Sequence, residues 1–179
     1  MLSQFGNYFQ GGFRKSAIQT LAFLSMVSSA FMSWKALAYV TNTESPAVVV
    51  LSGSMEPAFY RGDLLFLTLG SSPIEIGEVV VFKLPGRDIP IVHRVLKIHV
   101  KNETNEEFIL TKGDNNNDND RLLYDRKQLW LERHHIVGRV NGHLPYLGMI
   151  TIILNDYPKL KAALLGIMAL VALSSNEEQ

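Results

Sequence analysis

Residues 78–100, EVVVFKLPGRDIPIVHRVLKIHV, contain two apolar runs on either side of a Pro-Gly dipeptide. Val fills the first run, Glu78–Phe82, and Val and Ile recur in the second, Ile89–Val100. Branching at the β-carbon of these residues favours the extended backbone of a strand. Pro85-Gly86 between the runs is a typical turn signal. The stretch therefore predicts two β-strands joined by a turn.

Short runs of the same kind extend outward on both sides, between Glu44 and Gly148. Val, Ile, Leu and Phe fill them, and Gly, Pro, Asn and Ser separate them. We find no helical periodicity of any length there and no internal repeat. We therefore expect residues 44–148 to form one compact, mainly β domain. The additional runs are Val48–Leu51, Asp63–Thr68, Phe108–Thr111 and His135–Val140.

Upstream of this domain, residues 16–34 include no charged side chain. A helix of these 19 residues rises about 28 Å, close to the hydrocarbon core of a bilayer at about 30 Å. Arg14 and Lys15 precede it, and residues 1–15 contain no acid. Because basic residues stay on the cytosolic side, we expect residues 1–15 to be cytosolic, residues 16–40 to be a transmembrane signal anchor and the β domain to be lumenal.

Two alternatives remain open for this apolar stretch. A cleaved signal peptide would end in an A-x-A site, which Ala36-Leu37-Ala38 supplies, but the run is longer than the usual about 7–15 residues and Lys35 separates it from that site. A buried helix of a soluble domain is the other alternative. Asn102-Glu103-Thr104 is a glycosylation sequon that fits a lumenal location, although such triplets also arise by chance.

The C-terminal part of the chain has a second apolar stretch. Ala162–Leu173 offers 12 apolar or small positions, which rise about 18 Å as a helix and are too short to cross a bilayer unaided. We expect residues 149–179 to form a short apolar, interfacial helix and a tail. A helix docked on the soluble domain is the alternative.

Composition excludes several classes of function. The 179 residues include 17 basic and 17 acidic side chains, and this neutral balance argues against a nucleic-acid partner. The absence of cysteine excludes disulfides, thiolate metal sites and a cysteine nucleophile. His134-His135 is adjacent rather than spaced by four, and the chain has no H-E-x-x-H motif and no Gly-rich phosphate loop. We therefore expect no metal and no cofactor.

A candidate nucleophile follows the first apolar run. Ser54 lies in Leu51-Ser52-Gly53-Ser54-Met55-Glu56-Pro57, where small residues let the backbone turn sharply and let a substrate carbonyl approach. A serine hydroxyl stays inert until a neighbouring base takes its proton. By pattern alone, a simple turn between strands explains the same residues.

A candidate base lies within residues 78–100 themselves. His93 stands among strand-forming residues, where a histidine is usually a satisfied core or rim residue. Its imidazole titrates near neutral pH and can accept and return a proton, as a general base must. A general base also needs an acid on its other ring nitrogen. The run from Asp114 to Arg121 offers three carboxylates, those of Asp114, Asp118 and Asp120.

The same acidic run admits two other interpretations. Its alternating Asp and Asn residues are similar to the start of a calcium loop, but the glycine required at the sixth position is Asn119 and the glutamate required at the twelfth is Asp125. A merely solvated loop is the other interpretation. The catalytic, calcium-binding and solvated alternatives remain open on these residues alone.

Taken together, these segments resemble the type I signal peptidases. In particular they are similar to the catalytic subunit of the eukaryotic endoplasmic-reticulum signal peptidase complex. The resemblance runs nearly end to end and includes the N-terminal anchor. The motifs that carry it are SGSMEP at 52–57, RGDLL at 61–65, GEVVVF at 77–82, IVHRV at 91–95 and KGDNN at 112–116 with the Asp120-Arg121 pair that follows.

The resemblance implies a role for each matched residue. Ser54 matches the nucleophile of the family, and His93 stands where bacterial relatives have a lysine base. Ser52 matches a residue that helps hold the oxyanion in the bacterial branch, which fits the need for a donor near developing negative charge. Asn102 is a candidate for glycosylation.

Two acids match the family pattern. Asp120 corresponds to the third member of a Ser-His-Asp triad, and Asp114 corresponds to a second acid that the family needs. Which of Asp114, Asp118 or Asp120 contacts His93 stays open, because the loop departs from its relatives at Asn117 and Asp118.

The resemblance implies a membrane-anchored serine endopeptidase, a signal peptidase I, that removes N-terminal signal peptides after small residues at positions −1 and −3. Its partners would be preprotein signal peptides, accessory membrane subunits of a complex and the lipid bilayer. Its location would be the endoplasmic-reticulum membrane, as a single-pass type II protein. The rival functions are a catalytically inactive, peptide-binding subunit of a membrane complex and a calcium-regulated adhesion or structural domain.

Overall fold

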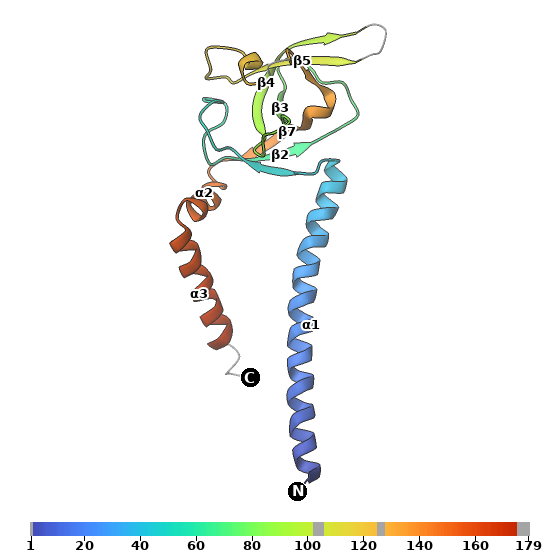
Figure 1. Ribbon diagram of the computed structural model, residues 1–179, viewed down its shortest axis with the longest axis vertical. Helices are drawn as coiled ribbons and strands as arrows, with labels where there is room; N and C mark the ends of the chain where they lie inside the picture. Colours follow the sequence, from blue (N-terminus) through green and yellow to red (C-terminus); the bar gives the residue numbers. More distant parts are fainter. Residues whose placement is uncertain (1, 102–105, 125–127, 175–179) are drawn as a thin grey trace. The chain divides into compact units, whose positions relative to one another are not determined.

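The computed structural model describes residues 2–101, 106–124 and 128–174 (Figure 1). The chain divides after Asn42 into two compact units. The first unit is the N-terminal helix, and the second contains the strands and the C-terminal helices. The sequence predicted an apolar N-terminal helix, a mainly β domain and one short C-terminal helix. The N-terminal helix and the mainly β domain are confirmed, and the C-terminal part is helical as predicted.

The first unit is one long helix, α1 (Leu2–Thr41). Within the residues that the structure describes, its segment Arg14–Thr41 is the one stretch long and apolar enough to cross a membrane. Three serine hydroxyls in this segment donate to carbonyls one turn earlier in the helix, as those of Ser25, Ser29 and Ser33 do. These bonds satisfy the three serine hydroxyls within the helix itself.

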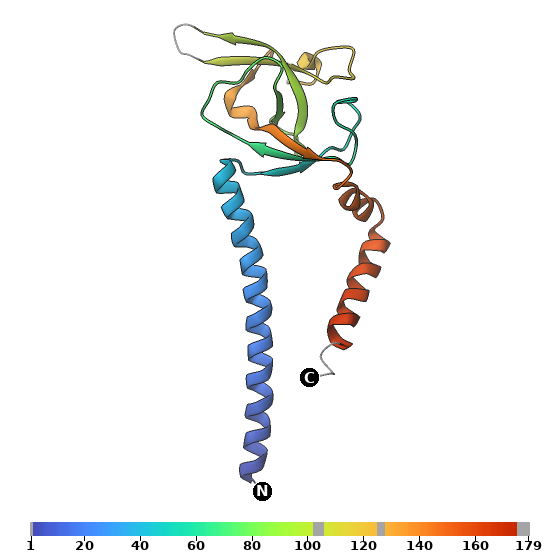
Figure 2. The same ribbon diagram turned by 180° about the vertical axis from the view of Figure 1, so that it is seen from behind.

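The second unit is built on one antiparallel sheet. Across the described residues it has seven strands in the order β1-β2-β7-β3-β4-β5-β6, and it curves into a half-barrel (Figures 1 and 2). Each predicted run coincides with or overlaps a strand, whereas the two-residue β6 was not predicted. The strands are β1 (Ala47–Val49), β2 (Leu64–Thr68), β3 (Val79–Phe82), β4 (Ile91–Val100), β5 (Glu107–Lys112), β6 (Leu131–Glu132) and β7 (Ile136–Leu144).

Residues 78–100, which contain β3 and β4, form the centre of this sheet. β3 pairs with β4 on one side and with β7 on the other. Successive side chains of a strand point to opposite faces, so Val80 and Phe82 join one apolar cluster while Val81 joins a second. All three are fully buried. A strand covered on both faces has no polar alternation, which is why the continuous run VVVF predicts it so clearly.

The C-terminal part forms two helices, α2 (Met149–Asp156) and α3 (Pro158–Ser174), where a single helix was expected. The break falls at Pro158, because proline lacks an N–H group and is favoured at the first position of a new helix. α2 is tied to the loop before β2, since the Gly148 N–H group donates to the Gly62 carbonyl at 2.8 Å. Gly62 has a φ of +96°, which favours glycine.

Candidate active site

Ser54 lies in the loop that joins β1 to β2. Two backbone bonds close the base of this loop, from the Val50 N–H group to Asp63 at 2.9 Å and from the Gly62 N–H group to Val50 at 2.8 Å. Met55 anchors its tip with a side chain only 1% exposed. The loop therefore holds the serine on a fixed turn beside the first strand.

The backbone of Ser54 is also bound to the loop that follows β5. The Asn115 N–H group donates to the Ser54 carbonyl at 2.9 Å, and the Asn115 side chain donates to the Gly53 carbonyl at 3.1 Å. The acidic run and the serine loop are therefore in direct contact, although about 60 residues of sequence separate them.

His93 points into the domain from β4. It is 3% exposed and lies on the same face of the strand as Val95, two residues further on. Its ring packs edge-to-face against Phe82, with ring centroids 6.3 Å apart. A histidine therefore occupies a position that the strand pattern would give to an apolar residue.

Asp120 is the acid that meets this histidine. It begins η1 (Asp120–Leu122), a short 3-10 helix, and is 1% exposed. Its Oδ2 atom lies 2.5 Å from His93 Nδ1. On the opposite side of the ring, His93 Nε2 lies 3.2 Å from Ser54 Oγ. The structure thus brings together three of the residues singled out in the sequence, in the order serine, histidine, aspartate.

These contacts fix the direction of each hydrogen bond. A carboxylate only accepts, so His93 Nδ1 carries the hydrogen that is donated to Asp120, and in the imidazole tautomer with this single N–H group Nε2 accepts from the Ser54 hydroxyl. Ser52 Oγ lies 3.3 Å from Ser54 Oγ. Since Ser54 donates to His93, the Ser52 hydroxyl is the donor in this pair. A second hydroxyl therefore points at the candidate nucleophile.

Asp114 has a different partner. Arg94 binds both of its carboxylate oxygens, with Nε at 2.9 Å from Oδ1 and the second contact at 2.7 Å from Oδ2. The hydrogen bond to Asp114 raises the pKa of the Arg94 guanidinium. Arg94 also donates to the Gly77 carbonyl at 2.8 Å. The acid next to the serine loop is therefore neutralised by an arginine of β4, and it does not contact His93.

The third acid of the run, Asp118, is exposed. The three carboxylates of this loop thus lie in different environments: Asp120 is buried, Asp114 is paired with an arginine, and Asp118 is exposed to solvent. Within residues 2–101, 106–124 and 128–174, no three His, Asp or Glu side chains lie together as metal ligands would. The glycosylation candidate Asn102 lies outside the described residues.

Gly113 is a site residue that the sequence analysis did not single out, although it lies in the KGDNN motif at 112–116. A Cβ atom at this position would lie 2.7 Å from the Ser54 carbonyl oxygen and 2.9 Å from His93 Nε2. Both separations are too short for a side chain. Glycine therefore lets the loop after β5 approach the serine and the histidine together.

A cavity of about 610 Å³ opens beside these groups. Its lining combines the apolar segments 48–51 and 89–92 with Ser52, Ser54 and His93. The serine hydroxyl thus faces a space walled mainly by Val, Ile and Leu. Such a lining favours the apolar part of a ligand, while the serine and the histidine supply the polar groups.

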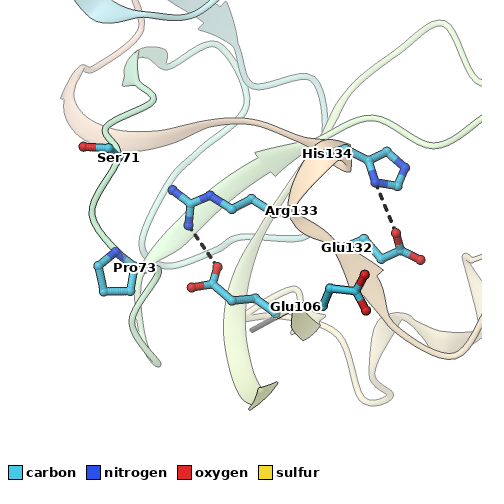
Figure 3. A pocket seen from close by; sticks show the side chains of 7 residues that line it. Ser71, Pro73, Glu106, Glu132, Arg133 and His134 are labelled. Carbon is cyan, nitrogen blue, oxygen red and sulfur yellow. Dashed lines mark hydrogen bonds and ion pairs between the residues drawn. The ribbon is translucent and has the colours of Figure 1, made fainter. Parts of the chain in front are cut away.

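A second cavity, of about 450 Å³, is lined by Ser71 and Pro73 together with several charged or titratable side chains (Figure 3). Arg133 in its wall pairs with Glu107 at 2.9 Å and donates to two carbonyls of the loop after β2. His134 pairs with Glu132 at 3.3 Å. The Arg133 charge in this wall is thus balanced by a neighbouring carboxylate, and none of the predicted site residues lines the cavity.

A serine, a histidine and an aspartate bonded in this order are typical of serine hydrolases. Comparison with known proteins gives the family. Residues 149–174 match the signal peptidase C-terminal short helix. The chain is 56% identical over 177 residues to the signal peptidase complex catalytic subunit SEC11C of Homo sapiens, covering 98% of this chain and 92% of that protein.

Two further relatives come from other organisms. The signal peptidase complex catalytic subunit SEC11 of Schizophyllum commune is 51% identical over 181 residues, covering 93% of this chain and 94% of the relative. The subunit of the same name in Dictyostelium discoideum is 52% identical over 161 residues, covering 90% of this chain and 89% of that protein. The chain belongs to the family of signal peptidase complex catalytic subunits.

Proposed function

We propose that this chain is a membrane-anchored serine endopeptidase that removes N-terminal signal peptides from preproteins entering the endoplasmic reticulum. The names of its relatives support signal-peptide removal as the activity. The observation that carries the serine mechanism is the continuous line from Ser54 through His93 to Asp120, at 3.2 and 2.5 Å, opening on an apolar cavity.

In the proposed first step, His93 Nε2 takes the Ser54 proton as the serine oxygen attacks the scissile carbonyl. Asp120 stabilises the imidazolium that forms. His93 then gives this proton to the leaving amine of the mature protein, which leaves the signal peptide as an ester on Ser54. Water, deprotonated by His93, cleaves the ester and restores the serine hydroxyl.

The negative charge that develops on the carbonyl oxygen needs a donor. Ser52 is the proposed side-chain donor, because its hydroxyl already points at Ser54 Oγ from 3.3 Å and is freed when that oxygen bonds to carbon. Backbone N–H groups of the serine loop would complete the oxyanion site.

We assign Asp114 a positioning role rather than a place in proton transfer. Its two bonds to Arg94 join the loop after β5 to β4, the strand that carries His93. That loop also carries Asn115, which binds the Ser54 carbonyl. Asp114 would therefore keep the nucleophile Ser54 and the base His93 in their positions relative to each other.

The proposed topology follows from the first helix. Residues 1–15 would be cytosolic, residues 16–40 would span the endoplasmic-reticulum membrane once, and residues 44–148 would form the lumenal protease domain. Residues 149–179 would lie at the interface with their apolar helices. Partners would be preprotein signal peptides and the accessory membrane subunits that the relatives' word "complex" implies.

Replacing Ser54 by Ala tests this function. We expect cleavage of a radiolabelled preprotein by the complex, purified through a tag on this chain, to fall by roughly 10⁴-fold or more, with assembly and preprotein binding retained. Ser71→Ala is the matched control, since Ser71 is an exposed serine of the second cavity, which no predicted site residue lines, and its loss should leave cleavage unchanged. Full activity of Ser54→Ala would reject the serine mechanism and favour a subunit that binds peptides without cutting them.

A further inference from the structure

Asp120 has a second buried partner that the mechanism above does not use. Thr111 of β5 donates from its hydroxyl to Asp120 Oδ2 at 2.6 Å, the same oxygen that accepts from His93. Thr111 is 0% exposed. It lies opposite Val95 in the β4–β5 pairing, and therefore on the face of the sheet to which His93 also points.

A tyrosine completes this arrangement. The Tyr124 hydroxyl lies 2.9 Å from Thr111 Oγ1 and 3.1 Å from the Thr111 backbone nitrogen. The Tyr124 N–H group also donates to the Asp120 carbonyl at 3.2 Å. Tyr124 is 6% exposed, and its ring packs edge-to-face on Phe82. The turn that carries the acid thus also carries the group that reaches back to its partner.

The direction of each hydrogen bond that links Asp120, Thr111 and Tyr124 follows from the groups involved. The carboxylate can only accept, so the single hydroxyl proton of Thr111 is committed to Asp120. Thr111 Oγ1 can then only accept from Tyr124, and the phenol oxygen accepts from the Thr111 N–H group. Burial raises the pKa of Tyr124, with Asp120 and Arg121 as the nearby charges, so the phenol keeps its proton at neutral pH.

We propose that Thr111 and Tyr124 are positioning residues for catalysis. Thr111 holds the Asp120 carboxylate in the rotamer that meets His93, and Tyr124 holds the Thr111 hydroxyl in the orientation that donates to Asp120. A carboxylate with a single partner could turn about its side-chain bonds, whereas one held from two directions stays aligned with the imidazole. This inference rests on the proposed serine mechanism.

The test compares two buried threonines in the purified complex. Thr111→Val should lower kcat for preprotein cleavage by roughly 10–100-fold and leave KM within about twofold, because the change acts on His93 through Asp120 and not on the substrate. Thr111→Ser should restore most of the activity. Thr43→Val is the matched control, since the Thr43 hydroxyl is also buried and donates to the Val137 carbonyl at 2.8 Å. It should lower stability and leave kcat unchanged.

Tyr124→Phe provides a variant that removes one oxygen atom and leaves the ring in place, and it should lower kcat by roughly 2–10-fold at unchanged KM. Wild-type kcat in either Thr111→Val or Tyr124→Phe overturns the inference, and so does a loss of kcat in Thr43→Val that equals the loss in Thr111→Val. Ser54→Ala, measured in parallel, separates a failure of the positioning role from a failure of the serine mechanism. If Ser54→Ala is inactive while Thr111→Val is normal, only the positioning role fails; if Ser54→Ala cleaves normally, the serine mechanism itself fails.

Discussion

The pairs His93–Asp120 and His134–Glu132 join the same two kinds of group in different surroundings. In the first pair the side chains are 4% and 1% exposed and the atoms lie 2.5 Å apart. In the second they are 68% and 54% exposed and 3.3 Å apart (Figure 3). Solvent screens the exposed pair, whereas the buried pair has further hydrogen-bonded partners at both ends.

The comparison teaches that pairing a histidine with an acid is not what makes a candidate base. His93 has Ser54 on its free nitrogen and a cavity beyond it, while Asp120 is held by Thr111. His134 has neither a nucleophile nor a fixed acid. Burial, a second contact on each partner and access to a substrate cavity distinguish the two pairs.

The largest contrast is expected when each acid is replaced by its amide. Asp120→Asn should lower kcat by about 10³–10⁴-fold, because the amide cannot stabilise the imidazolium by charge. Glu132→Gln, the matched change in the exposed pair, should leave cleavage unchanged. Initial rates of preprotein processing measure both. If Asp120→Asn retains more than a tenth of the wild-type rate, the buried pair has no special role.

A steric change should sharpen the same contrast without altering any charge. Gly113→Ala places a Cβ atom 2.7 Å from the Ser54 carbonyl oxygen and 2.9 Å from His93 Nε2. The loop must move, and a displacement of about 1 Å in an active site lowers rates by about 10²-fold. Gly142→Ala is the control, since its Cβ would meet no atom within 4 Å. Equal rates for both variants would contradict the packing that brings serine and histidine together.

The smallest effect is expected next to the exposed pair, at the buried His135, as a dependence of stability on pH. Burial lowers the pKa of His135, the neighbour of His134, and the His134 charge lowers it further. The unfolded chain, with an ordinary pKa of about 6.5, therefore takes up a proton that the folded chain refuses. The contribution of neutral His135 to the free energy of unfolding is therefore fully present above a pH of about 6.5, and it is lost as the pH falls below that value.

Thermal unfolding at pH 7.5 and 5.5 measures this loss in the wild type and in His135→Gln. We expect His135→Gln to remove part of the decrease in Tm on acidification, by less than about 4 °C for a chain of this size. An equal or larger decrease in the variant would show that another group causes the pH dependence.

Much of the fold was predictable because the decisive signals are local. β3 is buried on both faces and therefore has a continuous apolar sequence, and α1 is long and carries no charged side chain from residue 16 to residue 34. β6 was missed because two residues, Leu131 and Glu132, carry no periodicity. The division of the C-terminal segment at Pro158 was visible in the sequence but was not used.

The site was only partly predictable, for a physical reason. Ser54 and His93 stood out by residue type and by their flanking motifs. The choice among the three acids depends on how the loop after β5 turns, and no local pattern encodes that turn. Thr111 lies inside an apolar run and is also an ordinary strand former, so its hydroxyl gave no sign of its contact with Asp120.

The central claim is that Ser54 and His93 act as one unit, and a double variant tests it most directly. Single-turnover cleavage should be compared for Ser54→Ala, His93→Ala and the combination of both changes in the purified complex. We predict that the double variant is no slower than Ser54→Ala alone, because a base without its nucleophile has nothing to activate. If the two losses instead multiply, serine and histidine act independently, and the account of a shared proton transfer is contradicted.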